Sequence, residues 1–269
     1  MNTIAEAIRS KQGAHYYYPD GKPCFEVPNA SKGGMRSVTI TDAKKLGLYP
    51  SVTTILKDIR KHSLEEWKYE QYVLAALTTP KSSGETEKEY VTRIIESANE
   101  QSSLAMSFGS EIHSLIESAI ATGDTSIDPS MDKRVIETII PVYAFLAEHG
   151  FKGVSEQVVV NAGYKYAGTI DFLGDAFGHH YVVVDFKTQA TQQGKKVVYY
   201  DEWIYQLAAY GQCYATITMG PLRNLASVVI SSTEPGRIEY KIWSDEDAEC
   251  GWQTFKRYAE AFNLIRGLI

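Results

Sequence analysis

The spacing of hydrophobic positions changes at Gly150 and divides the chain into two kinds of segment. From Leu64 to His149 apolar residues recur at helical intervals, with interruptions near Pro80–Gly84 and Gly123–Pro129. After Gly150, β-rich runs bounded by turn residues predict three strands, a helix, two more strands and a final helix. We expect the strands at residues 154–160, 166–174, 181–188, 226–232 and 237–243, and the helices at 201–218 and from a Ser244 cap to 265.

Shorter elements are expected before residue 60. Residues 2–11 fit a short amphipathic helix, and residues 28–37 are rich in Gly, Ser and Lys, as in a loop. Three tyrosines, a Pro-Asp-Gly turn and residues 24–27 predict a β-hairpin. Thr41 and Ser51 are candidate caps of short helices over residues 42–46 and 52–59.

This order of elements predicts an α/β fold, in which a central mixed β-sheet is flanked by helices and preceded by a mostly helical N-terminal extension. We expect an N-terminal hairpin and short helices over residues 1–60 and a helical region over 61–149. Residues 150–269 would form the core, in one compact domain with 61–149.

The net charge of −6 argues against a nucleic-acid ligand until its distribution is considered. Residues 61–150 hold 7 basic against 15 acidic residues, whereas residues 1–60 hold 9 against 5. The acidity therefore lies in the helical middle of the chain. Bound divalent ions would also offset clustered carboxylates.

No apolar run is long enough to span a membrane, and the N-terminus lacks a signal-peptide core. The three cysteines are far apart, without metal-ligand spacing. We therefore expect a soluble protein in a reducing, intracellular compartment, with no membrane partner.

Two neighbouring strands carry the residues best suited to chemistry. Asp171 lies on the first, and Asp185 and Lys187 on the second, with a turn expected near Gly178. In antiparallel strands joined by that turn, Asp171 and Asp185 lie opposite or nearly opposite one another. Side chains alternate along a strand, so Asp185 and Lys187 share one face.

Two buried aspartates repel each other unless a proton or a cation is present. Hard oxygen ligands beside an ammonium group suit Mg²⁺ or Mn²⁺ acting on a phosphodiester. An Asp-x-Lys triplet on a strand also arises by chance, so the surrounding sequence must decide.

Several segments together resemble RecB-type nucleases of the PD-(D/E)XK superfamily. The similar segments are Gly168-Thr-Ile-Asp171, Val184-Asp185-Phe186-Lys187 and Tyr205-Gln206-Leu-Ala-Ala-Tyr210. Upstream, Phe108-Gly109-Ser-Glu-Ile-His113-Ser-Leu-Ile-Glu117 is similar to the family's Gly-x-x-x-His helix. The segment from Tyr49 to Leu56 resembles one in phage-encoded exonucleases and the mitochondrial genome maintenance exonuclease. Ile170 departs from the pattern, because the superfamily name has proline there.

The resemblance implies roles for individual residues. The metal ligands would be His113, Asp171, Asp185 and the carbonyl of Phe186. Lys187 would be the catalytic lysine, acting with Asp171 and Asp185, and Gln206 and Tyr210 would position it or contact the DNA backbone. Glu117 and Glu156 would be supporting residues.

The resemblance also implies an Mg²⁺- or Mn²⁺-dependent DNA exonuclease that prefers single strands with a free end. No iron–sulfur cluster is expected, since such branches need four cysteines. Replication or recombination proteins would be partners, and a phage-encoded chain would act in the cytoplasm of its bacterial host. Candidate DNA-binding residues are Lys44, Lys45, Arg60, Lys61, Lys195, Lys196 and Tyr17.

Each candidate has a structural alternative. Lysine pairs are often plain solvated charge, His113 and Gln206 could be edge residues of amphipathic helices, and Tyr17 could face a hairpin core. Functional alternatives are a double-strand exonuclease, a structure-specific endonuclease or an idle DNA-binding module. A glycosidase fits poorly, because Lys187 would keep both aspartates ionised.

Overall fold

The computed structural model describes residues 14–29, 33–58, 62–218 and 224–268. The chain divides into two compact units. The first comprises Met1–Asp58 and Ile112–Ile269, and the second comprises Ile59–Glu111. The helix expected over residues 2–11 lies outside the described residues.

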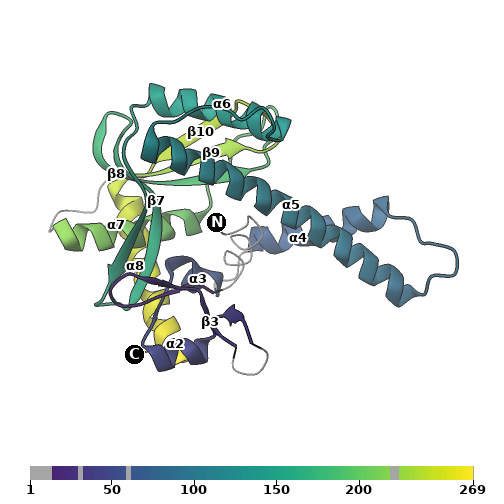
Figure 1. Ribbon diagram of the computed structural model, residues 1–269, viewed down its shortest axis with the longest axis horizontal. Helices are drawn as coiled ribbons and strands as arrows, with labels where there is room; N and C mark the ends of the chain where they lie inside the picture. The colour runs from purple at the N-terminus through teal and green to yellow at the C-terminus, as the bar shows by residue number, and fades with distance from the viewer. Residues whose placement is uncertain (1–13, 30–32, 59–61, 219–223, 269) are drawn as a thin grey trace. The chain divides into compact units, whose positions relative to one another are not determined.

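The first unit is built on a five-stranded mixed sheet with the order β10-β9-β8-β7-β6 (Figure 1). Neighbouring strands are antiparallel except β8 and β9, which run parallel. The strands are β6 (Lys152–Asn161), β7 (Tyr166–Ala176), β8 (His179–Gln189), β9 (Leu225–Ser231) and β10 (Ile238–Ile242). The expected α/β fold with a mixed sheet flanked by helices is confirmed.

A two-residue turn joins β7 to β8 at the predicted position. Phe177 and Gly178 both have positive φ, 57° and 75°. This is the backbone that type I′ hairpin turns require. The β7–β8 register shifts between Gly174 and Ala176, beyond the turn, and then pairs Gly174 with Val182 and Phe172 with Val184.

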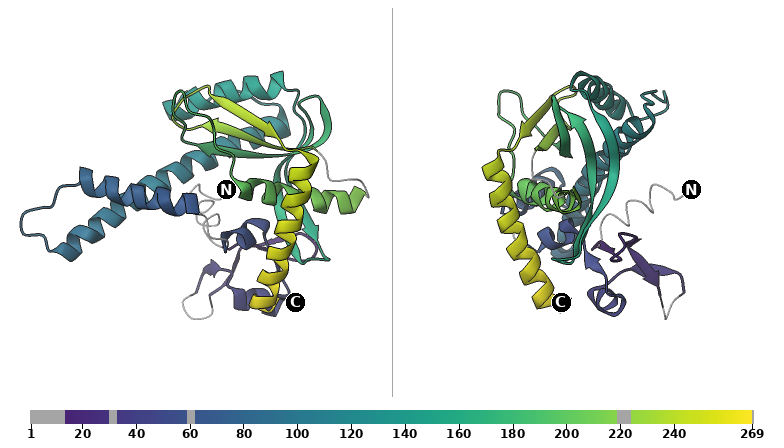
Figure 2. Two further views of the ribbon diagram at one scale, coloured as in Figure 1. Left: turned by 180° about the vertical axis from the view of Figure 1, so that it is seen from behind. Right: turned by 90° about the vertical axis from the view of Figure 1, so that its left-hand side faces the viewer.

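Helices cover the sheet and connect its parallel strands. α7 (Asp201–Thr218) links β8 to β9 and has the predicted bounds. The final helix α8 (Asp245–Arg266) begins at the predicted Ser244 cap and packs against α7 (Figure 2). The helix α6 (Lys133–Glu148) follows α5 (Glu87–Thr122), whose residues from Ile112 onward belong to this unit.

The segment before residue 58 is confirmed in part and corrected in part. β1 (Tyr16–Tyr17) pairs with β2 (Pro23–Cys24) as the hairpin prediction required, and also with β5 (Tyr49–Pro50). The helix α3 (Val52–Lys57) begins at its predicted Ser51 cap. Ser51 also bridges to Ala167 of β7, which brings the Tyr49–Leu56 segment against the sheet.

Two expectations in this segment were wrong. The helix α2 (Ile40–Leu46) is capped by Thr39 rather than Thr41, because the Thr39 hydroxyl accepts from the Asp42 amide while the Asp42 carboxylate accepts from the Thr39 amide. Part of the expected loop is a second hairpin, formed by β3 (Glu26–Pro28) and β4 (Met35–Ser37). Most of its residues are exposed and none is buried, so it lacks the buried face that marks a half-buried strand in a sequence.

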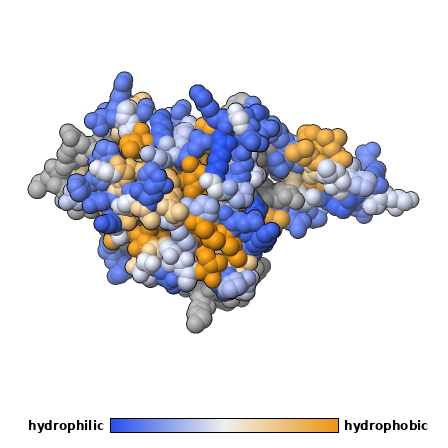
Figure 3. Space-filling model, turned by 90° about the horizontal axis from the view of Figure 1, so that it is seen from above, coloured by the Kyte–Doolittle hydropathy of each residue, from blue (hydrophilic) through white to orange (hydrophobic). Residues whose placement is uncertain are grey.

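The second unit contains a helical hairpin of α4 (His62–Thr78) and the first part of α5. Its core cluster contains Ala75, Ile94 and Ala98, with the partly buried Tyr72 and Tyr90 packed against them. The Tyr90 hydroxyl donates to the carbonyls of Ala76 and Thr79, which holds the start of α5 against the end of α4. Apolar side chains also gather on the surface of this hairpin (Figure 3).

Among the described residues, none of the helices combines the length and apolar character needed to cross a membrane.

Candidate active site

Asp185 is a buried carboxylate in a largely hydrophobic strand. It lies in β8 between Val184 and Phe186, and only 1% of its surface is exposed. The pKa of Asp185 is raised from its ordinary 3.8 to about 6, chiefly by burial. The neighbouring Asp171 contributes to the rise, while Lys187 and His113 oppose it. A buried acid of this kind at a functional site is usually held for its chemistry.

Lys187, two residues along the same strand, faces Asp185 as strand alternation predicts. Its Nζ lies 2.5 Å from Asp185 Oδ2. It also donates to Gln206 Oε1 at 3.2 Å. The ammonium is only partly exposed, so its charge acts in a weakly screened environment.

Gln206 connects the strand to α7. Its Nε2 donates to Asp185 Oδ1 at 2.9 Å and lies 3.3 Å from the Tyr210 hydroxyl, one helical turn away. Tyr210 is buried, and burial raises the pKa of its hydroxyl well above 10. The four residues Asp185, Lys187, Gln206 and Tyr210 therefore form one hydrogen-bonded network.

Asp171 and His113 reach the same region from β7 and α5. The Asp171 Oδ2 accepts from the Phe186 amide at 2.9 Å. His113 Nδ1 lies 3.6 Å from that oxygen, and its ring is edge-on to Phe186 with centroids 6.4 Å apart. Asp171 directly precedes Phe172, which pairs with Val184, so the antiparallel register places it opposite Asp185 as expected.

A glycine in the Asp171 strand makes room for the network. A Cβ on Gly168 would lie 2.5 Å from Tyr210 Cε1, so the Tyr210 ring packs where a side chain would stand. Gly168 begins the Gly168-Thr-Ile-Asp171 segment that resembles RecB-type nucleases, but the sequence analysis did not predict that it makes room for the Tyr210 ring. An isolated glycine inside a predicted strand is the signal for such a close approach.

Thr169 and Tyr17 form a second contact that sequence reasoning missed. The Tyr17 hydroxyl shares a hydrogen bond of 2.9 Å with Thr169 Oγ1, two residues before Asp171. Tyr17 is 3% exposed, and its ring is edge-on to Phe25. The Tyr17 ring is therefore buried at its hairpin, and a role of Tyr17 in DNA binding stays a prediction.

The two supporting glutamates are both on the surface. Glu156 is next to the residues of β6 that pair with Phe172 and Ile170, which puts it beside Asp171 across the ladder. Its φ of +52° is unusual for a non-glycine residue in a strand. Glu117 is exposed on α5, and its carbonyl accepts from the Ser155 hydroxyl.

The candidate DNA-binding lysines are exposed where they are described. Lys44 and Lys45 lie in the last turn of α2, and Lys195 and Lys196 lie in the connection between β8 and α7. Arg60 and Lys61 lie outside the described residues. None of these lysines belongs to the Asp185 network.

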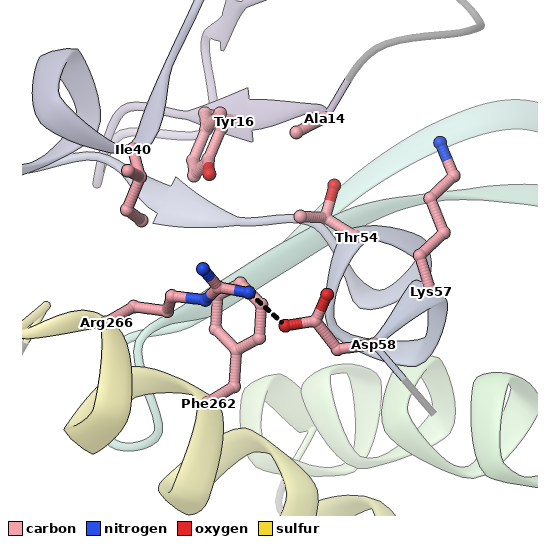
Figure 4. Close-up of a pocket in the computed structure, with 8 residues that line it drawn as sticks. All are labelled: Ala14, Tyr16, Ile40, Thr54, Lys57, Asp58, Phe262 and Arg266. Atoms are coloured by element: carbon pink, nitrogen blue, oxygen red, sulfur yellow. Dashed lines mark hydrogen bonds and ion pairs between the residues drawn. The ribbon is translucent and has the colours of Figure 1, made fainter. Parts of the chain in front are cut away.

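A pocket of about 260 Å³ lies elsewhere in the first unit, beside α3 and α8 (Figure 4). Its lining includes Tyr16, Phe262 and an ion pair between Arg266 and Asp58 at 2.8 Å. No residue of the Asp185 network lines it, so we do not assign the chemistry to this pocket.

The side chains around Asp185 are of the chemical type that binds a divalent cation. Asp185 Oδ2 is buried and, among the described residues, has no hydrogen-bond partner of good geometry despite the nearby Lys187. Paired carboxylate oxygens are the donors that Mg²⁺ and Mn²⁺ prefer. The described residues do not gather three His, Cys, Asp or Glu side chains into a ready metal cluster. The fit therefore rests on the aspartate pair, with His113 Nδ1 3.6 Å from Asp171 Oδ2.

Comparisons with known proteins bear on the fold and the family. A family model described as the PD-(D/E)XK nuclease superfamily matches residues 126–261. A solved structure titled "Crystal structure of SSO0001" is similar at 16% identity and a TM-score of 0.35, covering 76% of this chain and 86% of that chain. No curated protein matches.

The family match covers β6 to β10 and the helices α6 and α7, along with most of α8. It therefore includes Asp171, Asp185, Lys187, Gln206 and Tyr210. Superfamily members generally use divalent metal ions and act on DNA. The match covers half of the chain, and the chain is a nuclease that belongs to the PD-(D/E)XK superfamily.

Proposed function

We propose that this nuclease is an Mg²⁺- or Mn²⁺-dependent DNA exonuclease, with Asp171, Asp185 and Lys187 at its reaction centre. The observation that carries the proposal is the network in which Lys187 contacts both Asp185 and Gln206. If Lys187 and Asp185 formed only a structural ion pair, neither the Asp171 carboxylate nor a hydrogen bond from each of them to the Gln206 amide would be needed.

The aspartate pair would hold the cation, with the Phe186 carbonyl beside it and His113 as a further ligand. A divalent cation supplies Lewis acidity to a phosphodiester and lowers the pKa of a bound water. The raised pKa of Asp185 describes the protein without a cation, because a bound cation favours the ionised carboxylate.

The chain's own groups have separate tasks. Lys187 places a positive charge where the non-bridging phosphate oxygens gain negative charge during hydrolysis. Gln206 accepts from Lys187 and donates to Asp185, so it fixes the distance between the ammonium and the carboxylate. Tyr210 lies against Gln206 Nε2 and restricts the rotation of its amide. Lys187 and the aspartates are catalytic in this account, while Gln206 and Tyr210 are positioning residues.

The preference for a free single-stranded end is supported by charge and by resemblance. The acidic region 61–150 would repel a phosphate backbone, so DNA should follow a narrow basic path. Lys44, Lys45, Lys195 and Lys196 are exposed cations available for that path. The similarity to phage and mitochondrial exonucleases favours entry by an end. Double-strand exonuclease and structure-specific endonuclease activity remain the alternatives on this fold.

The test compares circular and linear single-stranded DNA of identical sequence under equal Mg²⁺. We expect degradation of the linear substrate only, with mononucleotides or short oligonucleotides accumulating from the earliest times. A linear duplex of the same sequence measures the strand preference in the same assay. Degradation of the circle at the linear rate would contradict the exonuclease proposal and leave the metal chemistry standing.

A further inference from the structure

The strand that carries Lys187 continues into a loop that presents two adjacent lysines. Residues 190–200, the basic loop, connect β8 to α7, and Lys187 lies two residues before the end of β8 at Gln189. Lys195 and Lys196 are exposed, as are the three residues before them. β8 and β9 run parallel, and ligands of α/β proteins commonly bind beyond the carboxyl ends of parallel strands. The basic loop therefore begins at the end of β8 that carries the proposed chemistry.

The start of the basic loop is fastened to the turn between β9 and β10. The Thr191 amide donates to the Thr233 hydroxyl at 2.9 Å, and that hydroxyl donates to the Thr191 carbonyl at 2.7 Å. The Thr191 hydroxyl contacts the Ser231 hydroxyl and the Glu234 carboxylate. The backbone and the side chain of Thr191 are thus both held by the same turn.

Arg237 holds the middle of the basic loop by its backbone. Its guanidinium donates to the Gln192 carbonyl at 3.1 Å and to the Lys195 carbonyl at 2.6 Å. The same guanidinium forms ion pairs with Glu234 at 2.8 Å and Glu239 at 2.7 Å, and only 23% of its side chain is exposed. Two carboxylates already offset its charge, so Arg237 is poorly suited to contact a phosphate itself. Its contacts instead fix the backbone from which the lysine side chains project.

The end of the basic loop is held by aromatic packing. Tyr199 lies edge-on to the buried Trp203 and Trp243, with ring centroids 6.0 and 6.4 Å apart, and Tyr200 lies edge-on to Trp203 at 5.2 Å. The loop is therefore anchored at its start, middle and end, although the side chains of residues 192–196 are exposed and add nothing to the core. Anchoring exposed polar residues in this way prepares them for a ligand, because less conformational freedom is lost on binding.

We propose that the basic loop is a preorganised contact for the DNA backbone, and that Arg237 is the positioning residue that directs Lys195 and Lys196 toward phosphates of the bound strand. The inference rests on the proposed function and extends it to how the substrate is held. Releasing the loop should weaken DNA binding and leave the chemical step unchanged. Lysine at position 237 keeps the charge but lacks the planar fork that reaches two carbonyls and two carboxylates at once.

Fluorescence anisotropy of labelled single-stranded DNA in EDTA measures binding without cleavage. Lys195→Ala/Lys196→Ala should raise the dissociation constant roughly tenfold. It should also reduce the slope of log affinity against log salt by about 1.4, or about 0.7 for each lost phosphate contact. Lys81→Ala/Lys88→Ala is the matched control, since it removes the same charge from exposed positions in the second unit and should bind as the original chain does.

Arg237→Lys tests the positioning role at unchanged net charge. It should raise the dissociation constant roughly threefold to tenfold. In the Lys195→Ala/Lys196→Ala background the same substitution should have less than about a twofold effect, because the side chains that Arg237 positions are gone. A merely structural role of Arg237 would instead give an equal loss in both backgrounds.

Limited trypsin digestion reports on the loop directly. Cleavage after Lys195 or Lys196 should be roughly tenfold or more faster in Arg237→Lys than in the original chain, because a released loop fits a protease site. Thr191→Val removes the hydroxyl that fastens the start of the loop, so it should speed digestion and weaken binding in the same direction. Urea unfolding confirms that each variant is folded under the assay conditions.

Cleavage kinetics in Mg²⁺ keep this inference distinct from the proposed function. Arg237→Lys should need more DNA for its half-maximal single-turnover rate and keep the saturated rate within about twofold. Unchanged DNA affinity in Lys195→Ala/Lys196→Ala, or an Arg237→Lys loss that persists undiminished without the two lysines, would overturn the inference. An original chain that binds DNA through the basic loop but does not cleave it would overturn the proposed reaction and support the role of the loop.

Discussion

At the scale of single residues, the proposed site depends on how the negative charge of a buried carboxylate is balanced. Asp185 is surrounded by hydrophobic strand residues, and the Lys187 ammonium beside it is shared with Gln206. Without a bound cation, the ionised form is therefore unfavourable, and the pKa rises to about 6. The same carboxylate is well placed to bind a cation because the protein does not fully satisfy it.

This balance predicts how Asp185→Asn changes stability with pH. The folded-state pKa is raised above the ordinary value, so folded protein binds the proton more tightly than unfolded protein does. The free energy of unfolding of the original chain therefore falls as pH rises from about 4 to about 6. The Asp185→Asn variant has no carboxyl group to ionise at this position, so its free energy of unfolding does not fall for this reason. In EDTA, Asp185→Asn should match the original chain at pH 4 and exceed it by about 1–3 kcal/mol at pH 7.5.

Thermal or urea unfolding at closely spaced pH values measures the difference. Adding Mg²⁺ at pH 7.5 should stabilise the original chain and leave Asp185→Asn unchanged, because only the carboxylate binds the cation. A stability difference that does not vary between pH 4 and 7.5 would show that the Asp185 carboxylate is not destabilised by burial.

At the scale of elements, the site depends on β7 lying close against α7. Gly168 provides the space for the Tyr210 ring, and Tyr166 on the same strand donates from its hydroxyl to the Ala209 carbonyl of α7. These contacts fix α7 over the sheet, and α7 carries Gln206 to Asp185.

Gly168→Ala should therefore damage stability and activity together. Its Cβ would overlap the buried Tyr210 ring, an overpacking that costs about 1–3 kcal/mol. The displaced ring would shift Gln206, so the cleavage rate should fall roughly tenfold or more. Urea unfolding and single-turnover cleavage measure the two effects.

A second substitution separates this steric cause from a general loss of folding. Tyr210→Leu in the Gly168→Ala background removes the ring that the new Cβ meets, so the double variant should be more stable than the sum of the two single effects predicts. Additive losses in the two variants would indicate that Gly168 acts through backbone conformation instead.

The elements show which features the sequence could predict. Periodicity and turn residues are local signals, so the five strands of the main sheet, α7, and the Ser51 and Ser244 caps were predictable. The Thr39 cap was missed although Thr39-x-x-Asp42 matches a capping box, because Thr41 is nearer the apolar run. The β3–β4 hairpin was missed for want of a buried face.

The tertiary contacts of the site needed the structure. Tyr17 and Thr169 are 152 residues apart, and nothing in either segment indicates that they share a hydrogen bond. His113 was assigned to the site by resemblance alone, since its border position on an amphipathic helix also fits an edge histidine. Its place beside Asp171 depends on how α5 crosses the sheet, which no local pattern encodes.

At the scale of the whole molecule, the chain combines a nuclease core with a helical hairpin of separate character. The family match begins at residue 126 and so excludes the hairpin of the second unit. Acidic charge concentrated in residues 61–150 would keep DNA from that region.

The central claim is that this chain cleaves DNA at a cation held by Asp171 and Asp185, with Lys187 assisting. The most direct measurement is single-turnover cleavage of end-labelled linear single-stranded DNA in Mg²⁺, with the original chain, Asp185→Asn and Lys187→Ala compared at equal folded concentration. We expect cleavage by the original chain that EDTA abolishes and none by Asp185→Asn. Lys187→Ala should bind Mn²⁺ normally and cleave roughly two to four orders of magnitude more slowly. Near-normal cleavage by folded Asp185→Asn would contradict the account.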